Sequence, residues 1–413
     1  SPSTMAAAPA AAAGADGAAG PAVGEDRIPA EALLRALLTA AARAAHIAIA
    51  VRQYPSFDEM VRRKPDRRKG SETTIDLVCI ADVLIQQTVE DDICKALPAL
   101  RGRVLGEEVV SFTDAASAEP IHISGFPAIE ADLKGLLGRI FPADASDLVN
   151  DLTAIFLKSA DDLVGDVDTS AVVGDVAIGD VAIWVDPLDS TNSYIKGKMP
   201  AGGGNITAES GALPSTTVLI GAFTVSSGRP VCGVVGVPFA THADEMWRSR
   251  YYWGVVGASC GGGSSSTGVF PAAADAILEV LPPDAPIVMS KSEEGVVVQA
   301  IENEFGPGST LAASGAGFKL LTCIRKMSSA YFLGLSSTYP WDTCGPHAII
   351  IAMGGEVVNA KSGEPLHYST TDRSAHENGV VTSLYRETTD KLVSVTGGVI
   401  GDLVAKGVYT VSC

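Results

Sequence analysis

The most informative segment of this sequence is Ile183-Trp184-Val185-Asp186-Pro187-Leu188-Asp189-Ser190-Thr191-Asn192-Ser193-Tyr194-Ile195-Lys196-Gly197. Its apolar beginning predicts a buried strand. Pro187 has no N–H to donate, so we expect strand pairing to stop there. The Ser-Thr-Asn sequence that follows is typical of a helix start, and the final glycine of a helix end. Asp186 and Asp189 are therefore expected to project from the end of a core strand, beside the N-terminus of a short helix.

These two aspartates suggest a cation site. Two negative charges this close repel each other unless a cation joins them. Mg²⁺ prefers carboxylate and phosphate oxygens in near-octahedral geometry, and the free N–H groups of a helix start suit a phosphate. The alternative is a solvated turn in which one aspartate simply caps the helix.

Composition limits the possible partners. The chain has 413 residues, of which 46% are hydrophobic and 19% charged. This length can form a large core with more than one lobe. The formal net charge is −18, from 30 basic and 48 acidic residues. An acidic chain argues against binding to nucleic acids or membrane surfaces, which use basic patches. A small anionic substrate is compatible with it, because a bound divalent metal reverses the local field.

Cysteine usage indicates a cellular compartment. The seven cysteines are odd in number and form no C-x-x-C pair, which is typical of a reduced, cytoplasmic protein that uses cysteine as a small hydrophobe. The usual zinc spacings are absent. We find no apolar run as long as a membrane span. The first 27 residues are rich in Ala, Pro and Gly, and we expect them to be disordered and not a signal peptide.

Three other places in the sequence carry carboxylates of interest. Asp82 lies in a predicted helix among apolar neighbours, so it needs a metal or, alternatively, a salt-bridge partner. Glu107 and Glu108 follow a strand pattern. Because neighbours on a strand point to opposite faces, both can reach one centre only if the strand ends or bends there. Asp342 is placed as a natural N-cap, and that structural role alone would explain it.

The remaining pattern predicts an α/β chain. Helices are expected at 28–53, 73–89, 129–140, 145–157, 293–305, 313–326 and 339–353. Strands are expected at 103–110, 217–225, 231–237, 245–256, 286–290, 330–335 and 357–365, and strands and turns in the tail to residue 413. The acidic segment 161–180 is expected to be a loop. The basic segment 56–70 indicates a solvated loop or a positive rim near an anionic substrate.

Together the motifs resemble the lithium-sensitive, magnesium-dependent phosphomonoesterases of the inositol monophosphatase superfamily. The matching segments come in the order Ala81-Asp82-Val83-Leu84, Gly106-Glu107-Glu108, Trp184 to Gly197, and Trp341-Asp342 to Gly355. They are most similar to the inositol polyphosphate 1-phosphatase branch. The nucleotidases and monophosphatases more usually have Gly where Ser190 stands. The resemblance runs from about residue 28 to about residue 400.

This resemblance implies a layered α/β/α/β/α sandwich with two lobes, residues 28–258 and 259–413, after a disordered segment 1–27. It implies two or three Mg²⁺ ions per site and inhibition by Li⁺. The implied ligands are Asp82, Glu107, Glu108, Asp186, the Leu188 carbonyl, Asp189 and Asp342. The implied reaction removes the 1-phosphate from inositol 1,4-bisphosphate and inositol 1,3,4-trisphosphate. Glu107 and Thr191, with Asp82, would orient and deprotonate the attacking water.

The resemblance also implies a substrate site. Its members are Asp189, Ser190, Thr191, Ser292, Gly315, Ala316 and Lys319. The family pattern has a lysine two residues after Ser292, where this chain has Glu294, and Lys291 is the expected substitute. Two alternatives stay open: a 3′(2′),5′-bisphosphate nucleotidase, which would need an adenine pocket, and a catalytically silent phosphate-binding protein. We expect a cytoplasmic monomer that binds a small inositol phosphate.

Overall fold

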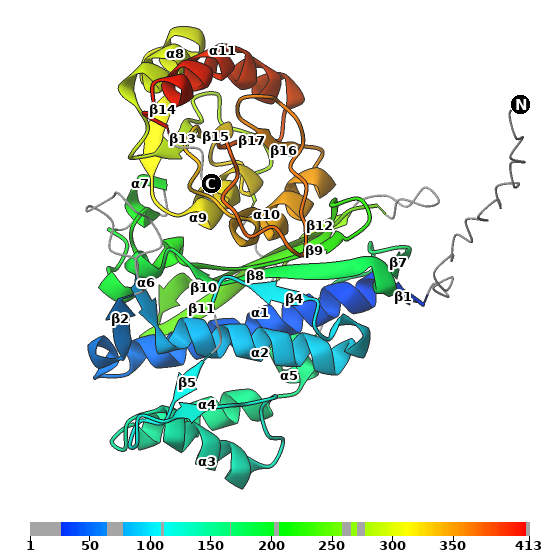
Figure 1. Ribbon diagram of the computed structural model, residues 1–413, viewed down its shortest axis with the longest axis vertical. Coiled ribbons are helices and arrows are strands. Elements are labelled where there is room, and N and C mark those ends of the chain that lie inside the picture. Colours follow the sequence, from blue (N-terminus) through cyan, green and yellow to red (C-terminus); the bar gives the residue numbers. More distant parts are fainter. Residues whose placement is uncertain are drawn as a thin grey trace, which may run out of the picture.

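Two β-sheets and three helical layers alternate through the molecule (Figure 1). The computed structural model of the protein describes residues 26–63, 77–108, 111–165, 167–201, 206–257, 266–270 and 277–409. Most of the predicted disordered segment, the basic segment beyond residue 63 and the glycine-rich segments 202–205 and 258–265 lie outside these residues. The expected layered α/β/α/β/α sandwich is confirmed.

The larger sheet has the strand order β12-β11-β10-β9-β8-β4. β8 pairs in parallel with β4 and antiparallel with β9. The strands are β4 (Val104–Gly106), β8 (Val181–Asp189), β9 (Thr217–Thr224), β10 (Pro230–Ala243), β11 (Met246–Val255) and β12 (Ser266–Phe270). Every residue of β8 is buried, as the apolar run predicts. β12 lies beyond residue 258 but belongs to this sheet, and the lobe boundary itself stays a prediction.

Helices α1 (Ala30–Gln53) and α2 (Ile80–Ala96) cover one face of this sheet (Figure 1). α1 buries Leu33, Leu34 and Leu37, whose spacing puts them on one side of a helix. By length and composition α1 could cross a membrane, so the expectation that no run reaches this length was wrong. In the fold, however, 72% of its most apolar window is buried. α1 is therefore the core helix of the first lobe.

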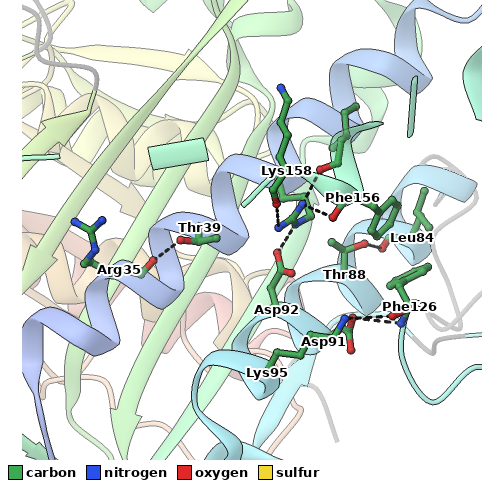
Figure 2. A network of polar contacts seen from close by, with 12 residues as sticks. Arg35, Thr39, Leu84, Thr88, Asp91, Asp92, Lys95, Phe126, Phe156 and Lys158 are labelled. Atoms are coloured by element: carbon green, nitrogen blue, oxygen red, sulfur yellow. Dashed lines mark hydrogen bonds and ion pairs between the residues drawn. The ribbon is translucent and has the colours of Figure 1, made fainter. Parts of the chain in front are cut away.

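A buried arginine, Arg43, joins three helices of this lobe, and Figure 2 labels its partners Asp92, Phe156 and Lys158. Arg43 of α1 is 6% exposed. Its Nε donates to Asp92 Oδ2 on α2 at 2.7 Å. Its terminal nitrogens donate to the carbonyls that end α4 (Ser146–Leu157), at residues Ile155, Phe156 and Lys158, at 2.6, 2.9 and 3.0 Å. The guanidinium thus satisfies carbonyls that a helix end leaves without an internal partner.

The rest of the first lobe consists of short elements. The expectation that segment 161–180 is a loop was wrong in part, because it contains most of α5 (Ala160–Val164) and all of β7 (Asp175–Ala177). The elements are α3 (Glu130–Ile140), α5 (Ala160–Val164), α6 (Thr191–Lys196), α7 (Ile206–Glu209), and the two-stranded pairs β1 (Arg27–Pro29) with β7 (Asp175–Ala177), β2 (Val61–Arg63) with β3 (Leu77–Cys79), and β5 (Phe112–Thr113) with β6 (Pro120–Ile121).

The second sheet forms the centre of the other lobe. Its order is β14-β13-β15-β17-β16. The strands are β13 (Ile287–Ser290), β14 (Thr310–Ala313), β15 (Ala330–Leu333), β16 (Glu356–Asn359) and β17 (Val380–Ser383). Helices α9 (Ala316–Ile324) and α10 (Pro340–Ala352) lie between the two sheets, and α8 (Gly295–Phe305) and α11 (Arg386–Ala405) lie on the outer face (Figure 1). The expectation of strands and turns in the tail is confirmed for β17 but is wrong after it, because α11 is a 20-residue helix.

Candidate active site

Three buried carboxylates converge where the two lobes meet. One oxygen from each of Asp186, Asp189 and Asp342 lies within 4.8 Å of the others. The three residues are 2%, 8% and 8% exposed. Asp186 and Asp189 project from the end of β8, as predicted. Pro187 does not end the strand, however: pairing with β9 resumes at Asp189 after an irregularity that accommodates the missing N–H.

Asp342 enters the site from the first turn of α10. The predicted N-cap role was wrong, because Tyr339 is the N-cap and Asp342 occupies the third helical position. From there its Oδ2 accepts the backbone N–H of Tyr339 at 2.7 Å. This arrangement is half of a capping box, and it orients the carboxylate toward the end of β8.

A row of glycines lets α10 approach the sheet. Gly221 of β9 pairs with Gly233 of β10. A Cβ at Gly221 would lie 2.3 Å from the amide nitrogen of Gly345 on α10, and one at Gly233 would lie 2.1 Å from its carbonyl oxygen. Neither distance is possible for a real side chain. The glycines therefore set how close the helix that carries Asp342 comes to the strand that carries Asp186.

Asp82 reaches the same region from the start of α2. It also occupies the third helical position, and its Oδ2 accepts the backbone N–H of Cys79 at 2.8 Å. The Thr191 hydroxyl oxygen lies 3.3 Å from Asp82 Oδ1 and 3.0 Å from the carbonyl oxygen of Leu188. The Leu188 N–H in turn donates to Asp186 Oδ1 at 3.1 Å. Hydrogen bonds thus connect four of the predicted residues in a chain, Asp82, Thr191, Leu188 and Asp186.

Glu107 and Glu108 follow the end of β4. The strand stops at Gly106. Both glutamates can reach one centre only if the strand ends or bends before them, and the structure meets this condition. The Glu107 N–H donates to the carbonyl of Val185 at 3.1 Å, which places it beside the last residues of β8. Sequence reasoning missed Gln86, which binds both the N–H and the carbonyl of Glu108, at 2.8 and 2.7 Å.

The carboxylates raise one another's pKa values. Burial, followed by the charges of neighbouring acids, raises the pKa of Asp186 and of Asp342 well above the ordinary value, and Glu107 is among those acids. Burial also raises the pKa of Asp189, an effect that the charge of Lys319 opposes. The pKa of Lys319 itself is lowered by burial to about 8. A cluster of this kind favours a bound cation, because several buried acids repel each other when ionised.

Helix α9 begins beside Asp189. The Gly317 N–H donates to Asp189 Oδ2 at 3.0 Å. Gly315, before the helix, has a φ of 82°, and a Cβ there would lie 2.1 Å from the Ser190 hydroxyl oxygen. Ser190 also has a positive φ, 67°. The predicted positions Ser190, Gly315 and Ala316 are therefore neighbours.

The other predicted substrate residues differ in exposure. Lys319 is 5% exposed, and its ammonium lies 5.2 Å from the centre of the Tyr331 ring. Lys291 and Ser292 are exposed residues that follow β13. The Ser292 hydroxyl lies 2.9 Å from that of Ser290. The part of Lys291 and Ser292 in substrate binding stays a prediction.

Comparison with known proteins identifies the family. The model of the inositol monophosphatase family matches residues 161–396. Inositol polyphosphate 1-phosphatase of Mus musculus is 30% identical over 342 residues, which cover 80% of this chain and 83% of that protein. The 3′(2′),5′-bisphosphate nucleotidase 1 of Dictyostelium discoideum is 26% identical over 50% of this chain and 61% of that protein.

A solved structure agrees at the level of the fold. The extragenic suppressor protein SuhB from Bartonella henselae matches with a TM-score of 0.51 and 13% identity, over 88% of this chain and 98% of that one. At this identity the likeness concerns the fold alone. The chain is therefore a phosphatase that belongs to the inositol monophosphatase family.

Proposed function

We propose that this phosphatase is a magnesium-dependent phosphomonoesterase that removes the 1-phosphate from inositol 1,4-bisphosphate and inositol 1,3,4-trisphosphate. The observation that carries the proposal is the convergence of three buried carboxylates from both lobes. The substrate class is supported by the relatives. Those named inositol polyphosphate 1-phosphatase align over 80% of this chain, whereas the first nucleotidase relatives align over 50%.

The donor set fits Mg²⁺, which binds oxygen ligands. Asp82, Glu107, Asp186, Asp189 and Asp342 would hold the ions, with the Leu188 carbonyl and Glu108 as further oxygen donors. The raised pKa values of Asp186 and Asp342 support this assignment, because positive charge there relieves the repulsion between the acids. When bound, Mg²⁺ would neutralise phosphate oxygens and make water more acidic.

The chain's own residues would handle the proton of the attacking water. Thr191 lies between the Leu188 carbonyl and Asp82. Its hydroxyl oxygen would accept a hydrogen bond from the water, while its own proton turns to Asp82 Oδ1. Because Thr191 contacts Asp82, we assign uptake of this proton to Asp82, and we keep Glu107 as a ligand of the metal. The first N–H groups of α9, among which that of Gly317 donates to Asp189 in this structure, would turn to phosphate oxygens when a cation holds Asp189.

The test is phosphate release from inositol 1,4-bisphosphate and, in parallel, from adenosine 3′,5′-bisphosphate, each with Mg²⁺ and with chelator. We expect Mg²⁺-dependent release with a strong preference for the inositol substrate. Thr191→Val should lower kcat about 100-fold or more, as expected for loss of a proton-transfer group. Thr191→Ser keeps the hydroxyl and is the matched control, which should retain most of the activity.

Two other outcomes would redirect the proposal. A preference for the nucleotide would favour a bisphosphate nucleotidase. Relatives with that name are among the proteins to which this chain is similar. Binding of Mg²⁺ without turnover of either ester would favour a silent phosphate-binding protein.

We also propose a reducing, cytoplasmic location. Its support is that the described cysteines, Cys79, Cys94, Cys232, Cys323 and Cys344, are buried free thiols.

A further inference from the structure

The Glu107 segment lies at the open edge of the larger sheet. β4 is the last strand in the order of that sheet. On its inner side the Glu107 N–H donates to the Val185 carbonyl. The outer side of an edge strand has no strand partner for its N–H and C=O groups. Without other contacts, the backbone that carries Glu107 would be held from one side only.

Two side chains bind this backbone at its open edge. Gln86 of α2 bonds to both backbone groups of Glu108, and a Cβ at Gly106 would lie 2.2 Å from the Gln86 side chain. Arg373, in the segment between β16 and β17, donates from Nη2 to the Gly106 carbonyl and lies 3.5 Å from the Glu107 carbonyl oxygen. The peptide units before and after Glu107 are therefore both fixed by side chains from elsewhere.

Arg373 is itself held by two tryptophans that neighbour the other carboxylates. Its guanidinium carbon lies 5.3 Å from the centre of the Trp184 ring and 5.4 Å from that of Trp341. Trp184 precedes Asp186 by two residues, and Trp341 directly precedes Asp342. The two tryptophan rings are 5.6 Å apart. One guanidinium thus contacts three of the four chain segments that bring acids to the site, the fourth being the start of α2 with Asp82.

The segment around Arg373 has its own anchors. The Trp184 indole N–H donates to the Ser369 carbonyl at 3.1 Å. The Ser374 N–H and hydroxyl both donate to Asp372 Oδ1, at 2.9 and 2.6 Å. These bonds shape the turn from which Arg373 extends, so its position does not depend on the Gly106 contact alone.

We propose that Arg373 is a positioning residue that holds the Glu107 carboxylate in the metal site and so couples the seating of segment 366–379 on the first lobe to metal affinity. This inference rests on the proposed metal-dependent function. The proposal predicts weaker metal binding when Arg373 is removed, which is the opposite of what its charge alone would predict. Removing a cation beside an acidic site would strengthen binding of a divalent metal by electrostatics, whereas loss of positioning weakens it.

The experiment measures Mn²⁺ binding to the full chain by the electron paramagnetic resonance signal of free Mn²⁺, without substrate. Arg373→Met removes the hydrogen bonds but keeps a long side chain over the tryptophans. We expect its Mn²⁺ dissociation constant to rise about 10-fold or more, as for other residues that orient metal ligands. Arg373→Lys keeps one donor and should fall between the parent and Arg373→Met.

Arg103→Met is the matched control, because Arg103 donates to the Gly179 carbonyl beside the opposite end of β4. It should leave Mn²⁺ binding unchanged. Unchanged or tighter binding by folded Arg373→Met, or by Arg373→Lys if only that variant folds, would overturn the proposal. A parent protein that binds no Mn²⁺ at all would instead refute the metal site on which the proposed function rests.

Discussion

Replacing Asp186 by asparagine should stabilise the metal-free protein and remove most of its stabilisation by Mg²⁺. Oxygens of Asp186, Asp189 and Asp342 lie within 4.8 Å of one another, so one ionised pair repels by about 3 kcal/mol at an effective dielectric constant near 20. Protonation limits this cost, because burial raises the pKa of Asp186. Asparagine keeps the oxygen that accepts the Leu188 N–H. We expect a gain of roughly 1–3 kcal/mol in the free energy of unfolding.

Urea unfolding in chelator and in Mg²⁺ measures both effects. With Mg²⁺ at 100 times its dissociation constant, the parent should gain about 2.7 kcal/mol, and Asp186→Asn much less. Asp151→Asn removes the same charge from an exposed position on α4 and should change neither value. The reasoning is refuted if Asp186→Asn is less stable than the parent in chelator, or if it gains as much from Mg²⁺.

The pH dependence has a defined sign. Asp186 has a pKa above its ordinary value of 3.8 in the fold, chiefly because it is buried. Its contribution to stability is therefore complete below the unfolded pKa and is lost as the pH rises through the folded pKa. In chelator, the parent should lose stability relative to Asp186→Asn from about pH 4 upward. The difference in stability between the parent and Asp186→Asn cancels the contributions of His46 and His376. Both titrate in the same pH range, because burial lowers their pKa values to about 4.

Three further predictions test the family reading and the scaffold. Phosphate release should be inhibited by Li⁺, and unchanged turnover at high Li⁺ would refute the lithium sensitivity that the resemblance implies. Ser190→Gly should raise the free energy of unfolding by up to about 1 kcal/mol in urea titrations, because φ is 67° at this position. Arg43→Met should cost about 3–5 kcal/mol, because it leaves Asp92 buried without this partner. Arg35→Met, which removes an ion pair to an exposed acid, should cost under about 1 kcal/mol.

The sequence is informative about the site because each candidate acid stands where a regular element begins or ends. Such positions are visible as an apolar run that stops or as a helix-start pattern, except at Asp82, which the sequence placed inside a helix over 73–89 whereas α2 begins at Ile80. Gln86 and Arg373 carry no such signal. Gln86 binds backbone groups of Glu108, 22 positions away, and Arg373 binds the carbonyl of Gly106, 267 positions away. A bond to a backbone group leaves no residue type on the partner side to be recognised.

Two errors in the predicted fold have physical causes. α11 is rich in Thr, Val and Gly, which have low helix propensity, so its composition suggests strands and turns. Its buried residues Thr389, Leu392, Thr396, Ile400 and Leu403 nevertheless recur at helical spacing. That periodicity was the available signal, and packing in the outer layer overrides propensity. At Pro187 the strand continues because the irregularity is local: Pro187 and Leu188 of β8 lie opposite the single residue Val218 of β9, and pairing resumes at Asp189.

Asp82 and Asp342 share a geometry that explains how an acidic site can be built into a stable fold. Each occupies the third position of its helix, and each gives one oxygen to the backbone N–H of the N-cap residue. That bond fixes the orientation of the carboxylate before any cation arrives, and it leaves the second oxygen for other partners. A negative charge in the first helical turn is also favoured by the helix dipole. The two helix starts thus offset part of the repulsion that the cluster creates, so the acids are oriented by the same bonds that begin α2 and α10.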